Sequence, residues 1–313
     1  MIVKKNTIIS LCNERKHGLL DISNSLVMYG NKNEQSLSFL SISNFNNLIS
    51  FLTKRKDKKE VCCVIWDNSL FTFISTLFLK FFSVKIIYYY HEPDGFKHKI
   101  VNLKANFFLA SIQFLAELCF KFLSDLRAVS LKNKLPKANF YLPLLYSDQR
   151  PPRLNVTKKI GFIGYIKRER SPELFNQVAS ILKNYGYEVI FFPSEKYGKS
   201  QKEKFKFLAN VEFIWNVFNC PNVLSAVSSD AFMSGTPLIV SKYEKFLPLL
   251  NKYNLAIRIN LNDSPETISK KILEYKYNST ILKKSLIKDQ STLGGNLAYK
   301  KFWSPVLNNL FTE

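Results

Sequence analysis

Short apolar runs alternate with longer segments of mixed character along the first half of the chain. Four runs stand out: NTIISL at 6–11, SLSFL at 36–40, EVCCVIW at 60–66 and VKIIYYY at 84–90. The segments between them are long enough for helices, and this alternation is typical of a parallel sheet whose strands are joined by crossover helices. We therefore expect a doubly wound, Rossmann-like α/β domain, whose ligands collect beyond the carboxyl ends of its strands.

The second half of the chain repeats this pattern with clearer helix boundaries. Residues 158–192 predict an apolar strand, a basic loop, a helix and a second strand. Ser171 is placed to cap that helix, Pro172 suits its first turn, and Gly186 follows its last turn. Further strands are expected at 210–215, 237–241 and 256–261, and a capped helix at 264–276. The pattern predicts a second parallel-sheet domain.

Residues 222–241, NVLSAVSSDAFMSGTPLIVS, predict a helix, a glycine stop and a buried strand in quick succession. Asn222 or Ser225 can cap the helix, and Gly235 can take the left-handed conformation that ends it. Pro237 then prevents its continuation. The first turn of such a helix carries exposed amide donors and about half a positive charge, so we expect it to favour an anion such as a phosphate.

Composition indicates a folded chain with room for two cores. The 313 residues exceed the size at which one hydrophobic core usually stops growing, and 46% of them are hydrophobic. Five cysteines, at positions 12, 62, 63, 119 and 220, form an odd set without the paired spacing of a metal site. We expect reduced, buried thiols in a cytosolic protein, and no bound metal. Residues 1–16 lack the long apolar stretch and cleavage site of a secretory signal, so export is not expected.

The net charge of +21 has four possible explanations: phosphate ligands, an anionic membrane, nucleic acid, or a bias toward lysine that only keeps the surface solvated. No nucleic-acid-binding module and no Walker sequence is apparent, so neither nucleic-acid binding nor phosphoryl transfer from ATP is expected. A basic surface gains on the order of 1 kcal/mol per well-placed lysine or arginine over anionic lipid. This favours a membrane-associated acceptor and a peripheral location at the inner face of the cell membrane.

Residues 104–123 predict a helix that is apolar around most of its circumference. A narrow polar stripe interrupts it and includes Gln113, Glu117 and Lys121. Such a helix is either buried against the sheet or interfacial, and the pattern leaves both open. Its length would allow it to span a membrane, but Glu117 and the flanking lysines make that costly.

A histidine follows the last apolar run of the first half. In YYYHEPDGF, His91 comes directly after the predicted strand and is followed by Glu92, a proline and a turn. An imidazole at that place should face a cleft rather than a core, which makes His91 the best polar candidate for catalysis. Asp67 follows an earlier strand in the same way; it has the simpler interpretation of a loop cap and is left unassigned.

The sequence DAFMSGTPLIVS, which begins at Asp230, resembles the donor-binding region of GT-B glycosyltransferases, above all those of family 4. It follows that family's acid, alanine, small residue, glycine, threonine or serine, proline and apolar strand nearly position by position. The family usually carries two glutamates separated by seven residues, and the corresponding positions here are Asn222 and Asp230. An asparagine could still hydrogen-bond a sugar hydroxyl. The alternative for Asp230 is a polar residue on the exposed face of a helix.

The basic loop of the second domain resembles the same family less closely. Gly164 matches the family's glycine, Tyr165 replaces its arginine, and Arg170 stands where the family has a lysine. The resemblance implies that this loop binds the nucleotide diphosphate, with Lys167 supplying further charge. Arginine pairs bidentately with phosphate oxygens, so the change from lysine keeps the role plausible. The alternative is a solvated charge cluster.

The resemblance implies the GT-B fold: two Rossmann-like, doubly wound α/β domains that face each other across a cleft. The expected parts are an acceptor-side domain at 1–147, a linker at 148–157, a nucleotide-sugar-binding domain at 158–292, and a helical segment at 293–313 that returns to the first domain.

The implied activity is transfer of a sugar, such as a hexose, from a nucleotide-diphosphate sugar to a glycan or lipid-linked acceptor. By resemblance the transfer is retaining and serves a bacterial surface polysaccharide such as O-antigen, lipopolysaccharide or capsule. Neither a metal nor another cofactor is expected, since positive side chains and helix amides stabilise the leaving diphosphate. His91 would bond the donor sugar or its phosphate, and Glu92 would orient it or meet the acceptor. The implied donor-binding residues are Gly164, Lys167, Arg170, Asn222, Ser225 and Asp230.

Two other classes stay open. The amide at position 222 and the loss of an arginine at 165 suggest a catalytically silent GT-B-like protein that binds a glycan, a membrane or a partner enzyme. The charge alone suggests a nucleic-acid-binding protein, whose binding to arbitrary DNA would be sensitive to salt.

Overall fold

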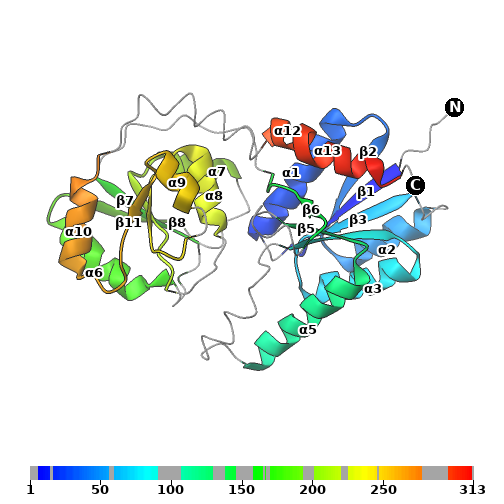
Figure 1. Cartoon of the computed structure of the whole chain (residues 1–313), viewed down its shortest axis with the longest axis horizontal. Coiled ribbons are helices and arrows are strands. Elements are labelled where there is room, and N and C mark those ends of the chain that lie inside the picture. The colour runs from blue at the N-terminus through cyan, green and yellow to red at the C-terminus, as the bar shows by residue number, and fades with distance from the viewer. Residues whose placement is uncertain are drawn as a thin grey trace. The chain divides into compact units, whose positions relative to one another are not determined.

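The computed structural model describes two compact units. One unit comprises Met1–Asp148 together with Ser291–Glu313, and the other comprises Gln149–Gln290 (Figure 1). The described residues are 6–14, 17–55, 60–90, 107–129, 138–145, 158–164, 166, 170–192, 201–219, 225–244, 247–276 and 295–311. The expected linker at 148–157 lies outside them.

The first unit contains a six-stranded parallel sheet in the order β2-β1-β3-β4-β5-β6. Its strands are β1 (Asn6–Leu11), β2 (Leu37–Ile42), β3 (Val61–Ile65), β4 (Lys85–Tyr90), β5 (Leu126–Val129) and β6 (Phe140–Tyr141). The four apolar runs of the first half therefore form β1 to β4. Of these, β1, β3 and β4 are buried along most of their length, as expected for a parallel sheet covered on both faces.

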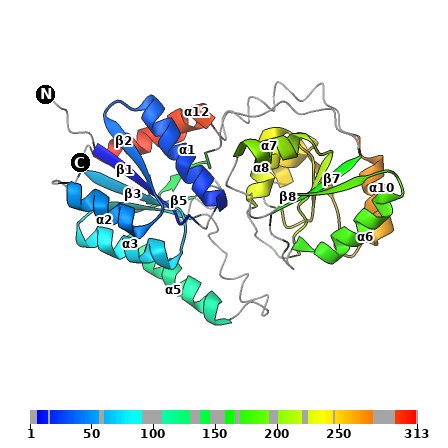
Figure 2. The same ribbon diagram turned by 180° about the vertical axis from the view of Figure 1, so that it is seen from behind.

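Helices cover both faces of this sheet. One face carries α2 (Phe45–Lys54), α3 (Leu70–Phe81) and α5 (Phe107–Leu123) (Figures 1 and 2). The other carries α1 (His17–Asn33), α12 (Gly295–Ala298), a π-helical turn (Tyr299–Trp303) and α13 (Ser304–Asn309). Of the helices that the structure describes, none is both long and apolar enough to cross a bilayer.

The C-terminal segment completes the core of the first unit. The buried ring of Trp303 lies 5.5 Å from that of Trp66 and 6.0 Å from that of Tyr89 between centroids. Its indole Nε1 donates to the carbonyl oxygen of Pro143 at 2.9 Å. A further anchor is Glu34, directly after α1, whose carboxylate accepts from Tyr299 Oη and from the Asn308 side chain. Residues 295–311 thus belong to this unit's core, although the whole second unit precedes them in the chain.

Asp67 joins the ends of two neighbouring strands. It is buried, and its carboxylate accepts from the backbone N–H of Asn13, after β1, and of Ser69, before α3, both at 2.8 Å. Thr72 adds a hydroxyl donor at 3.1 Å. The loop-cap interpretation of Asp67 is therefore correct, and the residue fixes the start of α3 against the sheet.

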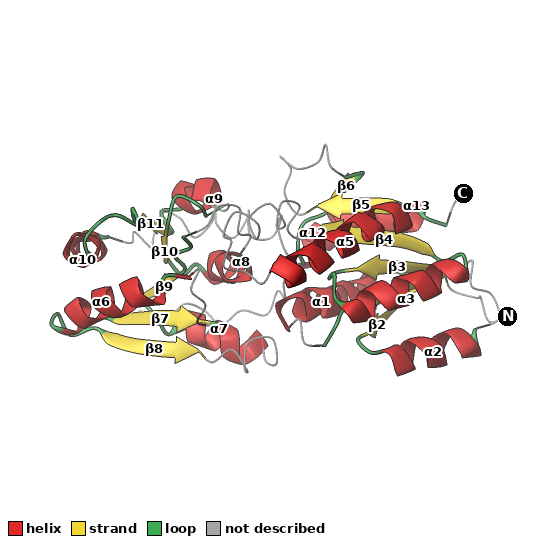
Figure 3. Ribbon diagram, turned by 90° about the horizontal axis from the view of Figure 1, so that it is seen from below, coloured by secondary structure: helices red, strands yellow, loops and turns green. Residues whose placement is uncertain are grey.

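The second unit contains a five-stranded parallel sheet in the order β11-β10-β9-β7-β8. Its strands are β7 (Lys159–Ile163), β8 (Glu188–Phe192), β9 (Phe213–Trp215), β10 (Leu238–Val240) and β11 (Ala256–Arg258). Its helices are α6 (Pro172–Lys183), α7 (Gln201–Ala209), α8 (Ala226–Ser234), α9 (Leu247–Lys252) and α10 (Pro265–Glu274). The helices α6 and α10 pack together on one face, and α7 and α8 lie on the other (Figures 1 and 3). Two parallel-sheet domains confirm the predicted fold class.

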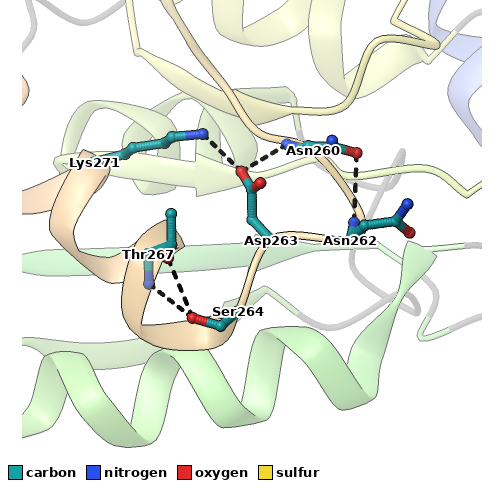
Figure 4. A network of polar contacts seen from close by, with 6 residues as sticks. All are labelled: Asn260, Asn262, Asp263, Ser264, Thr267 and Lys271. Atoms are coloured by element: carbon teal, nitrogen blue, oxygen red, sulfur yellow. Dashed lines mark hydrogen bonds and ion pairs between the residues drawn. The ribbon is translucent and has the colours of Figure 1, made fainter.

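The predicted helix signals of this unit hold in part. Gly235 ends α8 in the left-handed conformation at φ 70°, and Gly186 follows α6 at φ 83°. Ser264 caps α10 by accepting from the N–H of Thr267 at 3.2 Å (Figure 4). The predicted capping bond of Ser171 is wrong: the residue precedes α6 but has left-handed backbone angles, φ 49° and ψ 55°, and its hydroxyl makes no capping bond.

Replacing Trp303 by alanine should destabilise the first unit by about 3–5 kcal/mol, because it empties a site between two aromatic rings and removes a hydrogen bond. The variant Trp303→Phe should cost less, since it keeps most of the ring contact. Urea unfolding followed by circular dichroism measures both. Leu297→Ala, at an exposed position of the same segment, should change the free energy of unfolding by no more than about 0.5 kcal/mol. Equal effects of the tryptophan and leucine variants would contradict the assigned packing.

Two adjacent thiols in β3 should be unreactive in the folded protein. Cys62 and Cys63 are fully buried, and burial raises the pKa of Cys62 to about 12 and that of Cys63 well above its usual value. Only the thiolate is a nucleophile, so at pH 8 almost none is present in either residue. Iodoacetamide followed by peptide mass spectrometry should leave both unmodified until urea is added. Their modification at the rate of the half-buried Cys119 would contradict this.

Candidate active site

The carboxyl ends of β7 and β9 place the candidate donor-binding residues of the second unit. Gly164 follows β7 with φ at 89°, a conformation that residues with a side chain rarely adopt. A Cβ atom there would lie 3.4 Å from Nη1 of Arg170. The glycine thus turns the backbone away from the strand and lets the guanidinium approach it closely.

Arg170 lies beside this turn, and its guanidinium donates hydrogen bonds to groups of the protein. The side chain is 5% exposed and stands 4.4 Å from the centre of the Phe162 ring. It donates to the backbone carbonyl of Ile163, to that of Trp215 at 3.1 Å and to Oδ1 of Asn216 at 3.3 Å. These acceptors terminate β7 and β9, so the guanidinium holds the two strand ends together. The predicted contact of Arg170 with a pyrophosphate stays a prediction.

Asn216 connects this arginine to a buried carboxylate. Its carbonyl oxygen accepts from Arg170, and its amide nitrogen donates to Ser228 Oγ at 2.7 Å and to Glu244 Oε2 at 3.1 Å. Ser228 in turn donates to the same Glu244 oxygen at 2.6 Å. Asn216, Ser228 and Glu244 are at most 5% exposed. A fully hydrogen-bonded amide between opposite charges fixes the rotamers of all these groups, because an unsatisfied buried polar atom is costly.

The N-terminal end of α8 lies beside the polar cluster around Asn216. Ser225 occupies the cap position, but its hydroxyl donates to Asn216 Oδ1 at 3.2 Å and makes no capping bond to the helix. The amides of the first turn are therefore not covered by this side chain. The start of a helix beside strand ends is a favourable place for an anionic group.

Asp230 of α8 pairs with a lysine of α7. Its Oδ2 lies 2.9 Å from Lys204 Nζ, and both side chains are almost completely buried. The alternative that Asp230 is a polar residue on an exposed helix face is therefore wrong. The ion pair joins α8 to α7, whereas the predicted role of Asp230 toward nucleotide hydroxyls stays a prediction.

Of the sequence-predicted site residues, four are described by the structure and four are not. Arg170 and Ser225 both bond to Asn216, and Gly164 lies beside Arg170. Asp230 lies on the same helix as Ser228 but pairs with α7. Four others lie outside the described residues: His91, Glu92, Lys167 and Asn222. Among the residues that the structure places, no group of three or more His, Cys, Asp or Glu side chains could hold a metal ion.

Sequence reasoning missed Asn216, Glu244 and Lys204. Asn216 directly follows the apolar run at 210–215, so inspection of every strand end would have found it. Glu244 follows β10 by four residues in a short turn segment, and Lys204 lies on a helix rich in lysine. Neither position carries a signal that separates it from ordinary surface charge.

No protein-family model matches the sequence, and no curated protein matches it either. Solved structures do match over nearly the whole chain. HepE from Anabaena, in complex with UDP and glucose, has a TM-score of 0.62 at 9% identity and covers 99% of this chain and 100% of its own. Sucrose-phosphate synthase from Thermosynechococcus elongatus has a TM-score of 0.61 at 12% identity, over 98% of this chain and 99% of its own.

A third similar structure is a putative UDP-N-acetylglucosamine 2-epimerase from Listeria monocytogenes, with a TM-score of 0.60 at 12% identity, over 98% of this chain and 97% of its own. At such identities the likeness concerns the fold. It shows that the two parallel-sheet units match those of GT-B proteins.

Removing the lysine of the buried ion pair should destabilise the second unit strongly. Lys204→Ala leaves the Asp230 carboxylate without this partner, and breaking a buried pair in that way costs about 3–5 kcal/mol. The double variant Lys204→Met, Asp230→Leu replaces both charges by apolar groups and should recover most of this loss. Urea unfolding of both variants measures the difference. A single variant as stable as the parent protein would contradict the assigned pair.

Proposed function

We propose that the chain is a glycosyltransferase that moves a sugar from a nucleotide-diphosphate sugar to a glycan or lipid-linked acceptor. The observation that carries the proposal is the polar cluster around Asn216, at the carboxyl ends of the second sheet and beside the start of α8. In open α/β sheets ligands bind at that edge. Support comes from the DAFMSGTPLIVS motif that contributes α8 and β10, and from a fold shared with HepE, whose structure holds UDP and glucose.

In this proposal the second unit stabilises the diphosphate that leaves when the bond to the sugar's anomeric carbon breaks. Lys167 and the first amides of α8 would face its phosphate oxygens. Arg170 would act as a positioning residue: it holds the strand ends that carry the loop of Gly164 and adds positive potential beneath them. With this charge supplied by the protein, the proposed reaction uses no metal ion. Asp230 would meet the nucleotide, directly or by fixing α8.

The proposed catalytic residues, His91 and Glu92, belong to the first unit. His91 would bond the transferred sugar or its phosphate, and Glu92 would orient it or approach the acceptor. By the family 4 resemblance the transfer retains the anomeric configuration and extends a bacterial surface polysaccharide. The net charge of +21 suits an acceptor held in an anionic membrane, with the enzyme at the cytoplasmic face.

A catalytically silent, ligand-binding protein is the second candidate. Specific observations favour it: Asn222 and Tyr165 replace charged residues of the resembling family, and Asp230 is paired with Lys204. Titration with UDP, GDP and their sugars, followed by a transfer assay with lipid-linked acceptor extracts, separates the candidates. Sugar transfer supports the enzyme, and diphosphate binding without transfer supports the silent protein. Mass-neutral conversion of the sugar nucleotide without an acceptor would indicate an epimerase.

Kinetics of two variants test the proposed roles. Lys167→Ala should raise the KM for the donor by about tenfold, because a charge-assisted bond to phosphate contributes about 1.5–3 kcal/mol. His91→Ala should lower kcat by about 100-fold with a small change in KM, as expected for a group acting in the transition state. Lys183→Ala, in the last turn of α6, is the matched lysine control and should leave both constants unchanged. Parent-like kinetics in both test variants would refute the assigned site.

A further inference from the structure

The most exposed positions of α3 are all apolar. The exposed residues of this helix are Leu70, Ile74, Leu77 and Phe81, and the two at its ends are 72% and 81% exposed. Their spacing of four, three and four residues places them in one stripe along the helix. The opposite side buries Thr72, Ser75, Thr76 and Leu79 against the sheet. A surface helix of a globular protein normally has the reverse pattern, so this stripe calls for an apolar neighbour.

The neighbouring helix α2 shows that composition does not explain the stripe. It covers the same face of the sheet as α3 (Figure 1), and its exposed positions are mainly polar. They are Asn46, Asn47, Ile49, Ser50, Thr53 and Lys54. A chain-wide excess of apolar residues would affect both helices alike.

The helix α5 packs against α3 on the same side of the unit and also exposes apolar side chains (Figures 1 and 2). Among the side chains described on α5, the exposed ones are Leu115, Lys121 and Phe122, and Phe122 is 83% exposed. We call the set of six exposed apolar side chains the α3–α5 face. It consists of Leu70, Ile74, Leu77, Phe81, Leu115 and Phe122.

The charges near the α3–α5 face favour an anionic neighbour. Lysines lie in the last turns of α2, α3 and α5, at Lys54, Lys80 and Lys121, and all three helices end at the edge of the sheet where strands begin. Lys80 pairs with Asp125, whereas Lys54 and Lys121 are exposed. A second copy of a chain that carries +21 would bring like charges together, but an anionic lipid surface offers hydrocarbon for the stripe and phosphates for the lysines.

We propose that the α3–α5 face rests in the headgroup and acyl boundary of an anionic bilayer, with α3 and α5 lying on the membrane. Helices of 12 and 17 residues that expose apolar side chains are suited to this position, and neither is both long and apolar enough to span a bilayer. The proposal gives the suggested membrane location a defined contact surface. It stands independently of glycosyl transfer, because binding to lipid requires no donor.

Flotation with liposomes tests the face directly. The probes are vesicles of phosphatidylcholine alone and vesicles with about 30% phosphatidylglycerol, whose negative surface potential attracts basic segments. The full chain should float with the anionic vesicles, and the double variant Leu77→Ser, Phe81→Ser should lose at least tenfold in vesicle affinity. Leu297→Ser is the matched control, since Leu297 is 49% exposed on α12, on the other face of the sheet, and Leu77 is 45% exposed.

Parent-like flotation of the double variant, or failure of the parent chain to float, would overturn the proposal. Sedimentation velocity adds an independent outcome: an oligomer that the double variant abolishes would assign the face to a second copy and also overturn it. The thermal unfolding midpoint of each variant confirms that the exposed substitutions leave the fold intact. Hydrolysis of the donor in the absence of lipid, measured alongside, reports on the proposed activity separately from vesicle binding.

Discussion

Both units depend on one constraint: a parallel sheet must be covered on both faces. Its strands are apolar on both sides, and successive strands run in the same direction only if a crossover returns the chain over one face. The crossovers place the carboxyl ends of all strands at one edge of the sheet. There Arg170, beside Gly164, bonds to Asn216, although the two residues are far apart in the sequence. The place of the candidate site is therefore a consequence of how the sheet is buried.

Buried charge in the second unit is organised in two separate groups. Arg170 and Glu244 are linked through Asn216 at the strand ends, and Lys204 and Asp230 meet directly between two helices. Removing these charges from water costs a large free energy of desolvation, which only well-formed hydrogen bonds and ion pairs offset. Such groups contribute less to stability than to a single arrangement of loops and helices. A site that must hold a flexible diphosphate gains from that rigidity, because its donors are in place before the ligand arrives.

The sequence predicted the sheets well and the polar contacts poorly. The runs at 6–11 and 84–90 became β1 and β4 because hydrophobic periodicity reports which residues leave water. Gly235 and Ser264 ended and began helices as expected, since their signals are local. The partners of Arg170 could not be predicted in this way. The Trp215 carbonyl and the Asn216 side chain are 45 and 46 residues away along the chain, and only the fold brings them near.

The apolar face of α3 eluded sequence analysis for a related reason. A helix of mostly apolar residues is expected to be buried on all sides, and the pattern contains no information on how many layers cover it. In the structure one side of α3 packs on the sheet, and the opposite side is exposed.

The interrupted first unit also has a consequence for synthesis. Trp303 closes a core whose other rings, Trp66 and Tyr89, are made more than 200 residues earlier. The second unit is contiguous, so on the ribosome it has all its residues while the first still waits for its last helix. The nascent chain thus finishes its domains in the reverse of their order of appearance, and an incomplete chain presents an open aromatic core to whatever binds unfolded protein.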